Sequence, residues 1–278
     1  MKHDLLTPLQ VAGAGLLQPV SVQRWREQQL TQSEDVVAVE VPVALEYNGI
    51  SHVVMLASPG ALEDFALGFS LSEGILKNAS ELYDCEVVTQ ADGILVKLQV
   101  ASERFVSLKE KRRNMTGRTG CGLCGAETLQ QVFHHPTAVS QSHTVPAQHL
   151  LDGMRAMQAL QPLQQQSGAT HAAAWMNENG EVVCVREDVG RHNALDKLIG
   201  ALASAGEDFS QGALLITSRA SYEMVQKSAM MGIGVVAAIS APTSLAVQLA
   251  QDTGVTLAGF MRDQSYVVYA HPERIQQP

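Results

Sequence analysis

The sequence predicts an α/β protein in which a smaller, β-rich part of α+β character precedes a three-layer α/β domain. In the first part, apolar runs rich in valine flank the dipeptide Asn48-Gly49, which is typical of a tight hairpin. In the second part, nearly continuous apolar strand patterns alternate with helical patterns, as in a sheet that helices cover on both faces. We therefore expect an N-terminal arm at 1–33, the α+β part at 34–135 and the three-layer domain at 136–278.

The arm at 1–33 is polar and glutamine-rich, and the strand patterns of the first part start at residue 36. Pro59 precedes a helical pattern in which Leu62, Phe65 and Phe69 share one face. In chain order, we expect strands at 36–39, 41–45 and 52–56, a helix after Pro59, a hairpin with strands at 87–88 and 94–96, and a helix at 126–133.

The second part follows a stretch rich in serine, glutamine and histidine between Pro136 and Pro146, which is typical of a linker. Its first two strands are joined by Asn179-Gly180, another turn dipeptide. We expect helices at 150–160, 194–203, 222–231 and 245–251, and strands at 171–175, 182–185, 213–217, 235–239, 255–260 and 266–269.

Composition and charge exclude several classes of protein. With 46% hydrophobic and 17% charged residues, the chain is typical of a soluble globular protein, and its net charge of -9 argues against general nucleic-acid binding. No run approaches the ~18 apolar residues of a membrane helix. The apolar stretch at 5–17 is interrupted by Pro8 and Gln10 and lacks a small-residue cleavage site, so we expect a cytoplasmic protein.

Two of the four cysteines lie in the sequence CGLC at 121–124, within a glycine-rich and cationic stretch. The helix expected at 126–133 would place the second of them near a helix N-terminus, and Arg118 adds positive charge. Both effects lower a cysteine pKa and raise the reactivity of the thiol at neutral pH. Cys85 and Cys184 lie in apolar strand patterns instead, where a cysteine acts as a small hydrophobic residue.

Three chemistries fit the pair Cys121 and Cys124. A zinc site needs about four ligands, and the nearby His134 and His135 do not match a zinc-finger spacing, although two chains could pool their cysteine pairs. A thioredoxin-like redox pair lacks the strand and helix expected upstream of it. In sulfur transfer, one thiolate carries a persulfide and the second thiol can resolve it.

Basic residues outnumber acidic ones between residues 104 and 118, just before the cysteine pair. In an acidic chain, such a local excess favours an anionic ligand or an acidic partner surface. The alternative is a solvated flexible loop that has no ligand.

Two loops between an expected strand and an expected helix carry residues that suit a phosphate. Gly190 permits close approach of the backbone, Arg191 can bind a phosphate through two nitrogens, and Asp188 can accept a hydrogen bond from a base. The alternative is that Asp188 or Asn193 only caps a helix. Because Arg219 repeats the arrangement one unit later, a nucleotide-like ligand is favoured. The loop residues concerned are Asp188, Gly190, Arg191, His192, Ser218 and Arg219.

Several motifs of the chain occur together in one known family. They are RTGCGLCG at 118–125, THAAA at 170–174, EDVGRHNALDK at 187–197, SRASYEMVQK at 218–227, and FALGF at 65–69 with EGI at 73–75. In this order they make the chain resemble the FdhD family, the formate dehydrogenase accessory sulfurtransferases. The resemblance covers nearly the whole chain after residue 35.

The resemblance implies a sulfur carrier that acts between a cysteine desulfurase and the molybdenum cofactor of formate dehydrogenase. Cys121 matches the cysteine that carries the persulfide, and Cys124 matches its companion. The resemblance further implies a homodimer, no permanently bound metal, and a second domain with a cytidine-deaminase-like fold that has lost its zinc chemistry. Two rival functions are a zinc-clamped chaperone that moves no sulfur and a nucleotide-binding regulator.

The acceptor implied by the resemblance is the molybdenum cofactor bis(molybdopterin guanine dinucleotide), whose phosphates and guanines suit the two arginine loops. The segment similar to the family's cofactor-binding stretch consists of Phe260, Met261, Arg262, Asp263, Gln264 and Ser265. The last three of these residues stand where a Gly-Arg pair is frequent in the family, so the chain departs from the family pattern there.

Overall fold

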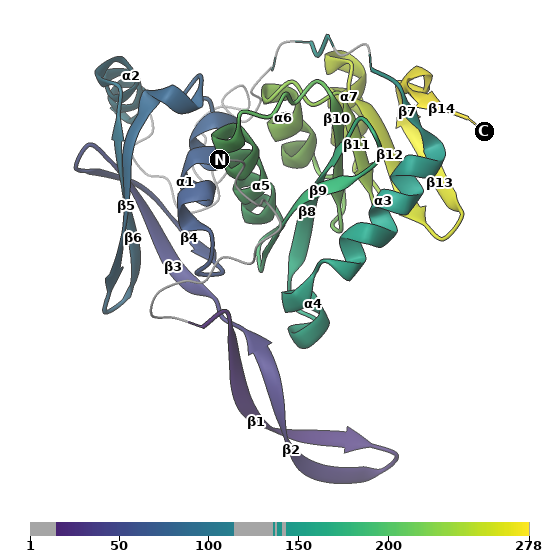
Figure 1. The fold of residues 1–278 in the computed structure, drawn as a ribbon. Helices are drawn as coiled ribbons and strands as arrows, with labels where there is room; N and C mark the ends of the chain where they lie inside the picture. The colour runs from purple at the N-terminus through teal and green to yellow at the C-terminus, as the bar shows by residue number, and fades with distance from the viewer. Residues whose placement is uncertain (1–14, 114–135, 137, 141–142, 278) are drawn as a thin grey trace.

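The structure is a computed structural model that describes residues 15–113, 136, 138–140 and 143–277, with the backbone alone at 109–113. The helix expected at 126–133 and the cysteine pair lie outside the described residues. The chain forms a four-stranded sheet, a six-stranded sheet and a two-stranded ribbon among its described residues. Figure 1 shows helices between the two larger sheets and the long ribbon projecting from the body.

The first part is built on a sheet with the strand order β4-β3-β6-β5. Asn48 and Gly49 make the predicted turn with φ angles of 46° and 83°, and the second predicted hairpin closes between Gln90 and Gly93. Both hairpins and the helix predicted after Pro59 are therefore confirmed. The elements are β3 (Val41–Tyr47), β4 (Ile50–Ala57), α1 (Leu62–Ser72), β5 (Leu82–Gln90) and β6 (Gly93–Val100).

The expected N-terminal arm contains a regular antiparallel ribbon of β1 (Leu17–Arg26) and β2 (Gln29–Ala38), seen at the bottom of Figure 1. The boundary expected between residues 33 and 34 falls inside β2. The sequence pattern did not predict β1, because most of its side chains are exposed and polar. The turn gives no sequence signal either. Its residues Glu27 and Gln28 adopt positive φ angles of 51° and 63°, where asparagine or glycine is usual.

Part of the basic stretch forms the helix α2 (Ser102–Arg113), which the sequence analysis did not predict. Arg104 is held against the sheet part, because its Nε lies 3.0 Å from Oε1 of Glu81. The start of this stretch is thus ordered by a specific ion pair, and a solvated loop is the wrong description of it.

The second part is built on a six-stranded sheet with the order β13-β12-β11-β10-β8-β9. The three central strands β10, β11 and β12 run parallel, whereas β8, β9 and β13 pair antiparallel with their neighbours. The six strands predicted for this part are confirmed. They are β8 (His171–Asn177), β9 (Val182–Asp188), β10 (Gly212–Ile216), β11 (Val235–Ala238), β12 (Thr256–Arg262) and β13 (Ser265–Ala270).

Helices cover both faces of this sheet, which confirms the three-layer prediction and agrees with the cytidine-deaminase-like architecture that the resemblance implies. Alternate residues of β8 show the two faces: Trp175 belongs to the core beneath α5, α6 and α7, and Met176 belongs to the core beneath α3. The helices and shorter elements are α3 (Ala147–Ala159), α4 (Pro162–Ser167), α5 (Arg191–Ala205), α6 (Tyr222–Met230), α7 (Ser244–Thr253), β7 (Val145–Pro146) and β14 (Ile275–Gln276). Within the described part of the chain, no helix has the length and apolar character that crossing a membrane requires.

The two parts share one apolar core, which runs across the division expected between them. Where α1 meets α5, glycines stand at the contact. A Cβ atom on Gly68 would lie 1.7 Å from the carbonyl oxygen of Asp196, and one on Gly200 would lie 1.9 Å from that of Asp64. Lys227 of α6 adds a buried ion pair to Asp196 at 3.0 Å. The central sheet and the first part therefore position each other.

We expect Gly200→Ala to lower the free energy of unfolding by about 2 kcal/mol or more, because the added methyl group meets backbone of α1 that cannot turn aside. Gly153→Ala in α3 is the matched control. Its Cβ would meet Sδ of Met176 at 2.9 Å and Cδ1 of Leu215 at 3.0 Å, and these side-chain ends can move. Urea unfolding measures the free energy of unfolding of both variants. Equal losses would show that a methyl group against backbone is no more destabilising here than one against side-chain ends.

Candidate functional site

One edge of the central sheet gathers the loops that the sequence analysis singled out. The parallel strands β10, β11 and β12 end there. β8 runs antiparallel to β10 and begins at the same edge, and β9 ends there because His171 at the start of β8 pairs with Asp188 at the end of β9. The loops after β9, β10, β11 and β12 therefore lie along one edge, as expected for a ligand site in such a sheet.

Asp188 is buried inside the protein and holds the first of these loops. Its Oδ2 lies 2.6 Å from Nζ of Lys197 and accepts the backbone N–H of Ser58 at 3.0 Å. Its Oδ1 accepts the N–H of Gly190 at 2.8 Å and the amide of Asn193 at 2.9 Å. With 0% of its surface exposed and both oxygens engaged, Asp188 positions the loop and the start of α5 and does not present an acceptor to a base.

The helices α5 and α6 begin at this edge without a side-chain cap. Gly190 precedes α5, and Ser221 precedes α6 without making a cap hydrogen bond. In contrast, α7 is capped by Thr243, whose hydroxyl accepts the N–H of Ala246 at 3.4 Å. Uncapped first-turn N–H groups, together with the helix dipole, suit an anion.

Two polar side chains around these helix starts add hydrogen-bond donors that have no acceptor among the described residues. Nε of Arg191 and Oγ of Ser221 are buried, and neither has a hydrogen-bond partner among the described residues. Buried polar groups are nearly always paired, so these two atoms are open to hydrogen bonds from water or from a ligand. His171 lies nearby, and burial together with the charges of Arg191 and His192 lowers its pKa, which keeps its ring neutral at neutral pH.

The second arginine loop contributes differently from the first. The hydroxyl of Ser218 is turned inward and donates to the carbonyl of Arg219 at 3.0 Å, whereas Arg219 itself is exposed. Thr217 ties the loop to β8, because its hydroxyl oxygen accepts the N–H of Ala172 at 2.9 Å. Thr217, His171 and Ser221 were not predicted as site residues from the sequence, although His171 and Ser221 lie inside the motifs at 170–174 and 218–227.

The segment at 260–265 lies at the same edge, where the N–H of Phe260 donates to the carbonyl of Ser240 at 3.3 Å. Phe260 has a φ angle of 52°, which is unusual for a bulky residue, and 38% of it is exposed. Met261 is fully buried in the core beneath α3, so its side chain cannot reach a ligand. The exposed residues of this segment are Phe260, Arg262, Asp263, Gln264 and Ser265.

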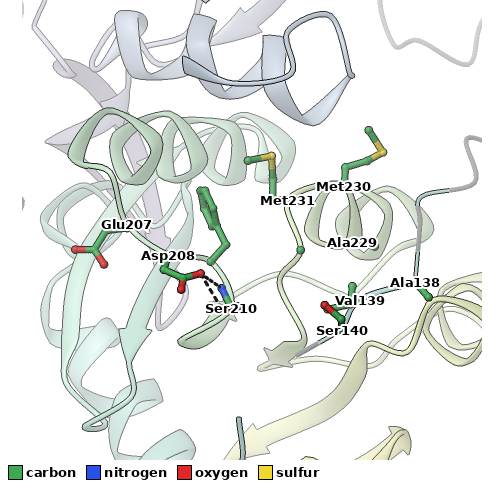
Figure 2. Close-up of a pocket in the computed structure, with 11 residues that line it drawn as sticks. Ala138, Val139, Ser140, Glu207, Asp208, Ser210, Ala229, Met230 and Met231 are labelled. Carbon is green, nitrogen blue, oxygen red and sulfur yellow. Dashed lines mark hydrogen bonds between the residues drawn. The ribbon is translucent and has the colours of Figure 1, made fainter. Parts of the chain in front are cut away.

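A cavity of about 460 Å³ lies at the opposite edge, at the carboxyl ends of α5 and α6 (Figure 2). Asp208 lines it beside Met230 and Met231, and its carboxylate accepts the N–H and the hydroxyl of Ser210 at 2.9 and 2.7 Å. These bonds lower the pKa of Asp208, so the carboxylate is charged. Since none of the described lining residues is basic, the cavity does not suit a phosphate.

The described cysteines have the properties of core residues. Cys184 is fully buried, and burial raises its pKa to about 11. Cys85 is half-buried, and burial raises its pKa to about 12. Both thiols are protonated and unreactive at neutral pH. The predicted reactive residues Cys121 and Cys124 lie outside the described residues, and no group of three metal-binding side chains occurs among those that the structure describes.

Comparison with known proteins gives consistent results. A family model described as the FdhD/NarQ family matches residues 38–276. A protein of Cupriavidus necator named sulfur carrier protein FdhD is 60% identical over 256 residues, which are 92% of this chain and 89% of that protein. A Bordetella petrii protein of the same name is 55% identical and covers 88% of each chain.

A solved structure shares the fold. The crystal structure of a formate dehydrogenase accessory protein from Desulfotalea psychrophila matches with a TM-score of 0.73 and 25% sequence identity, over 94% of this chain and all of the other. The fold, the family model and the close relatives agree along nearly the whole described chain. The chain belongs to the FdhD/NarQ family.

Proposed function

We propose that this chain is a sulfurtransferase that supplies sulfur for the activity of formate dehydrogenase. In this proposal, Cys121 receives sulfur from a cysteine desulfurase as a persulfide. The sulfur then passes to bis(molybdopterin guanine dinucleotide) with its molybdenum, which is bound as a substrate at the carboxyl edge of the central sheet. Membership of a family whose relatives are named sulfur carrier proteins supports the sulfur step.

The observation that carries the proposal is the difference between the two kinds of cysteine in this chain. Of its four cysteines, Cys85 and Cys184 have raised pKa values because they are buried. A thiol that carries sulfur has to be a thiolate and accessible to its donor. Cys121 and Cys124 are the remaining candidates, and their glycine-rich, cationic surroundings in the sequence favour a thiolate.

The loading step follows ordinary thiol exchange. The Cys121 thiolate attacks the terminal sulfur of the donor's persulfide, a new S–S bond forms, and the donor's cysteine leaves as a thiolate. Cys124 could release the sulfur by attacking the Cys121 persulfide, which forms a disulfide between the two residues and expels the terminal sulfur as sulfide. No external oxidant is needed, because the sulfane sulfur is reduced as the two thiols are oxidised.

The acceptor is anionic, and the edge of the sheet offers what its phosphates need. Several hydrogen-bond donors there have no acceptor among the described residues. They are the first-turn N–H groups of the uncapped helices α5 and α6, Nε of Arg191 and the hydroxyl of Ser221. Arg219 is exposed nearby and adds positive charge. The strained and exposed Phe260 offers a flat apolar surface on which a guanine can stack.

We expect whole-protein mass spectrometry to show the addition of a sulfur atom after incubation with a cysteine desulfurase and cysteine. The double variant Cys121→Ala with Cys124→Ala should gain none, and Cys85→Ala with Cys184→Ala, the matched control, should load like the wild type. Undiminished loading of the first variant would remove the proposal. Stoichiometric zinc that is lost from the same variant would favour the zinc-clamped chaperone.

We expect Arg191→Ala to weaken the binding of GDP, used as a fragment of the acceptor, by about tenfold or more, because a charge-assisted hydrogen bond is lost. Arg155→Ala removes the same charge from the exposed surface of α3, which covers the other face of the sheet, and should leave the affinity within about twofold. Isothermal titration calorimetry measures both. Equal losses of affinity in the two variants would mean that GDP binding depends on the net charge of the protein and not on Arg191 itself.

We expect Phe260→Ala and Phe260→Gly to weaken GDP binding alike, because base stacking on an aromatic ring contributes about 1–3 kcal/mol. Their stabilities should differ: the glycine variant should be more stable than the alanine variant by about 1 kcal/mol, because only alanine is strained at a φ angle of 52°. Calorimetry and urea unfolding test the two effects separately. GDP binding that both variants retain would contradict stacking on Phe260.

A further inference from the structure

One carboxylate lies inside the proposed anion site. Glu223 is in the first turn of α6, and its Oε2 is 2.7 Å from Nε2 of His192 in the first turn of α5. This close contact with His192, helped by the charges of His192, Arg191 and Lys227, holds the pKa of Glu223 below its usual value. Glu223 is therefore ionised at neutral pH and joins the starts of the two uncapped helices.

The groups that face Glu223 are those that a phosphate would use. A helix N-terminus stabilises either a side-chain carboxylate or a bound anion, and the two compete for the same partial positive charge. One carboxylate does not satisfy all the donors present, because Nε of Arg191 and Oγ of Ser221 are still without partners among the described residues. The site is thus partly neutralised by its own side chain and still equipped to receive more oxygen atoms.

We propose that Glu223 is the counter-ion of this anion site when no ligand is bound. Glu223 contacts His192 while the site is free of phosphate, and this contact breaks when a phosphate-bearing ligand enters. The inference rests on the proposed anion site and adds a determinant of its affinity. Each bound phosphate then has to replace an interaction that already exists, so the ligand is held more weakly than the donors alone would hold it. Weaker binding is suited to a protein that passes its ligand on.

The test uses the full-length chain, with inorganic phosphate and GDP as separate probes. Glu223→Gln keeps the size of the side chain and removes its charge. We expect the Kd of both probes to fall by about threefold to tenfold at low ionic strength, and the gain to shrink as salt is added. Glu207→Gln is the matched control, because it makes the same change in net charge at the opposite edge of the sheet, and its Kd values should stay within about twofold of the wild type.

Each outcome decides the matter. An unchanged Kd in Glu223→Gln would show that the carboxylate does not compete, and a raised Kd would show that it orients His192 for the ligand, so both overturn the counter-ion. Failure of both probes to bind the wild type would instead overturn the anion site, leaving the sulfur-loading step untouched.

A second measurement does not depend on the folding of the Glu223 variant. In the wild type, the imidazole NMR signal of His192, assigned by its loss in His192→Gln, should move as phosphate is added, because its partner is exchanged. A signal that keeps its position at saturating phosphate would count against the proposal.

Discussion

The buried ion pair between Asp188 and Lys197 is the interaction on which the candidate site depends. Both side chains are almost fully buried, and the pair is 2.6 Å apart. Removing one member of such a pair leaves an uncompensated buried charge, at a cost of about 3–5 kcal/mol. Because the same carboxylate also binds the N–H of Gly190 and the amide of Asn193, it fixes both the loop and the start of α5. A buried residue thus sets the geometry of the loop that the proposed ligand would contact.

The same division of roles recurs within both long motifs of the α/β domain. In the first, Arg191 lies at the edge of the sheet, whereas Lys197 further along α5 is buried and also donates to the carbonyl of Ser58 in the first part. In the second, Arg219 is exposed at the edge, whereas Lys227 is buried against α1 and α5. Positive charge in a motif is therefore not by itself a sign of ligand contact, and burial separates the fully buried structural lysines from the half-buried Arg191 and the exposed Arg219.

Local patterns in the sequence were sufficient to predict the central sheet, because its middle strands β10 and β11 are apolar throughout and helices such as α7 have one buried face. They did not predict the β1–β2 ribbon, whose Glu27-Gln28 turn and polar strands carry no local signal. The loops of the candidate site were predicted, but the contact between His192 and Glu223 was not. It joins two different helices, so it depends on how they pack on the sheet, which no local pattern records.

Sulfur transfer and anion binding place opposite demands on a protein. Anion binding at the edge of the sheet needs donors fixed in advance, and these come from α5 and α6 packed on a rigid core. The same core is unsuitable for a sulfur-carrying thiol, because burial raises the pKa of Cys85 and Cys184 well above neutrality. A thiolate has to stand outside such a core, and the glycine-rich, cationic sequence around Cys121 is of the kind that favours a reactive thiolate. In the proposed function the two tasks therefore belong to different segments of the chain, and the transfer step has to bring these segments together.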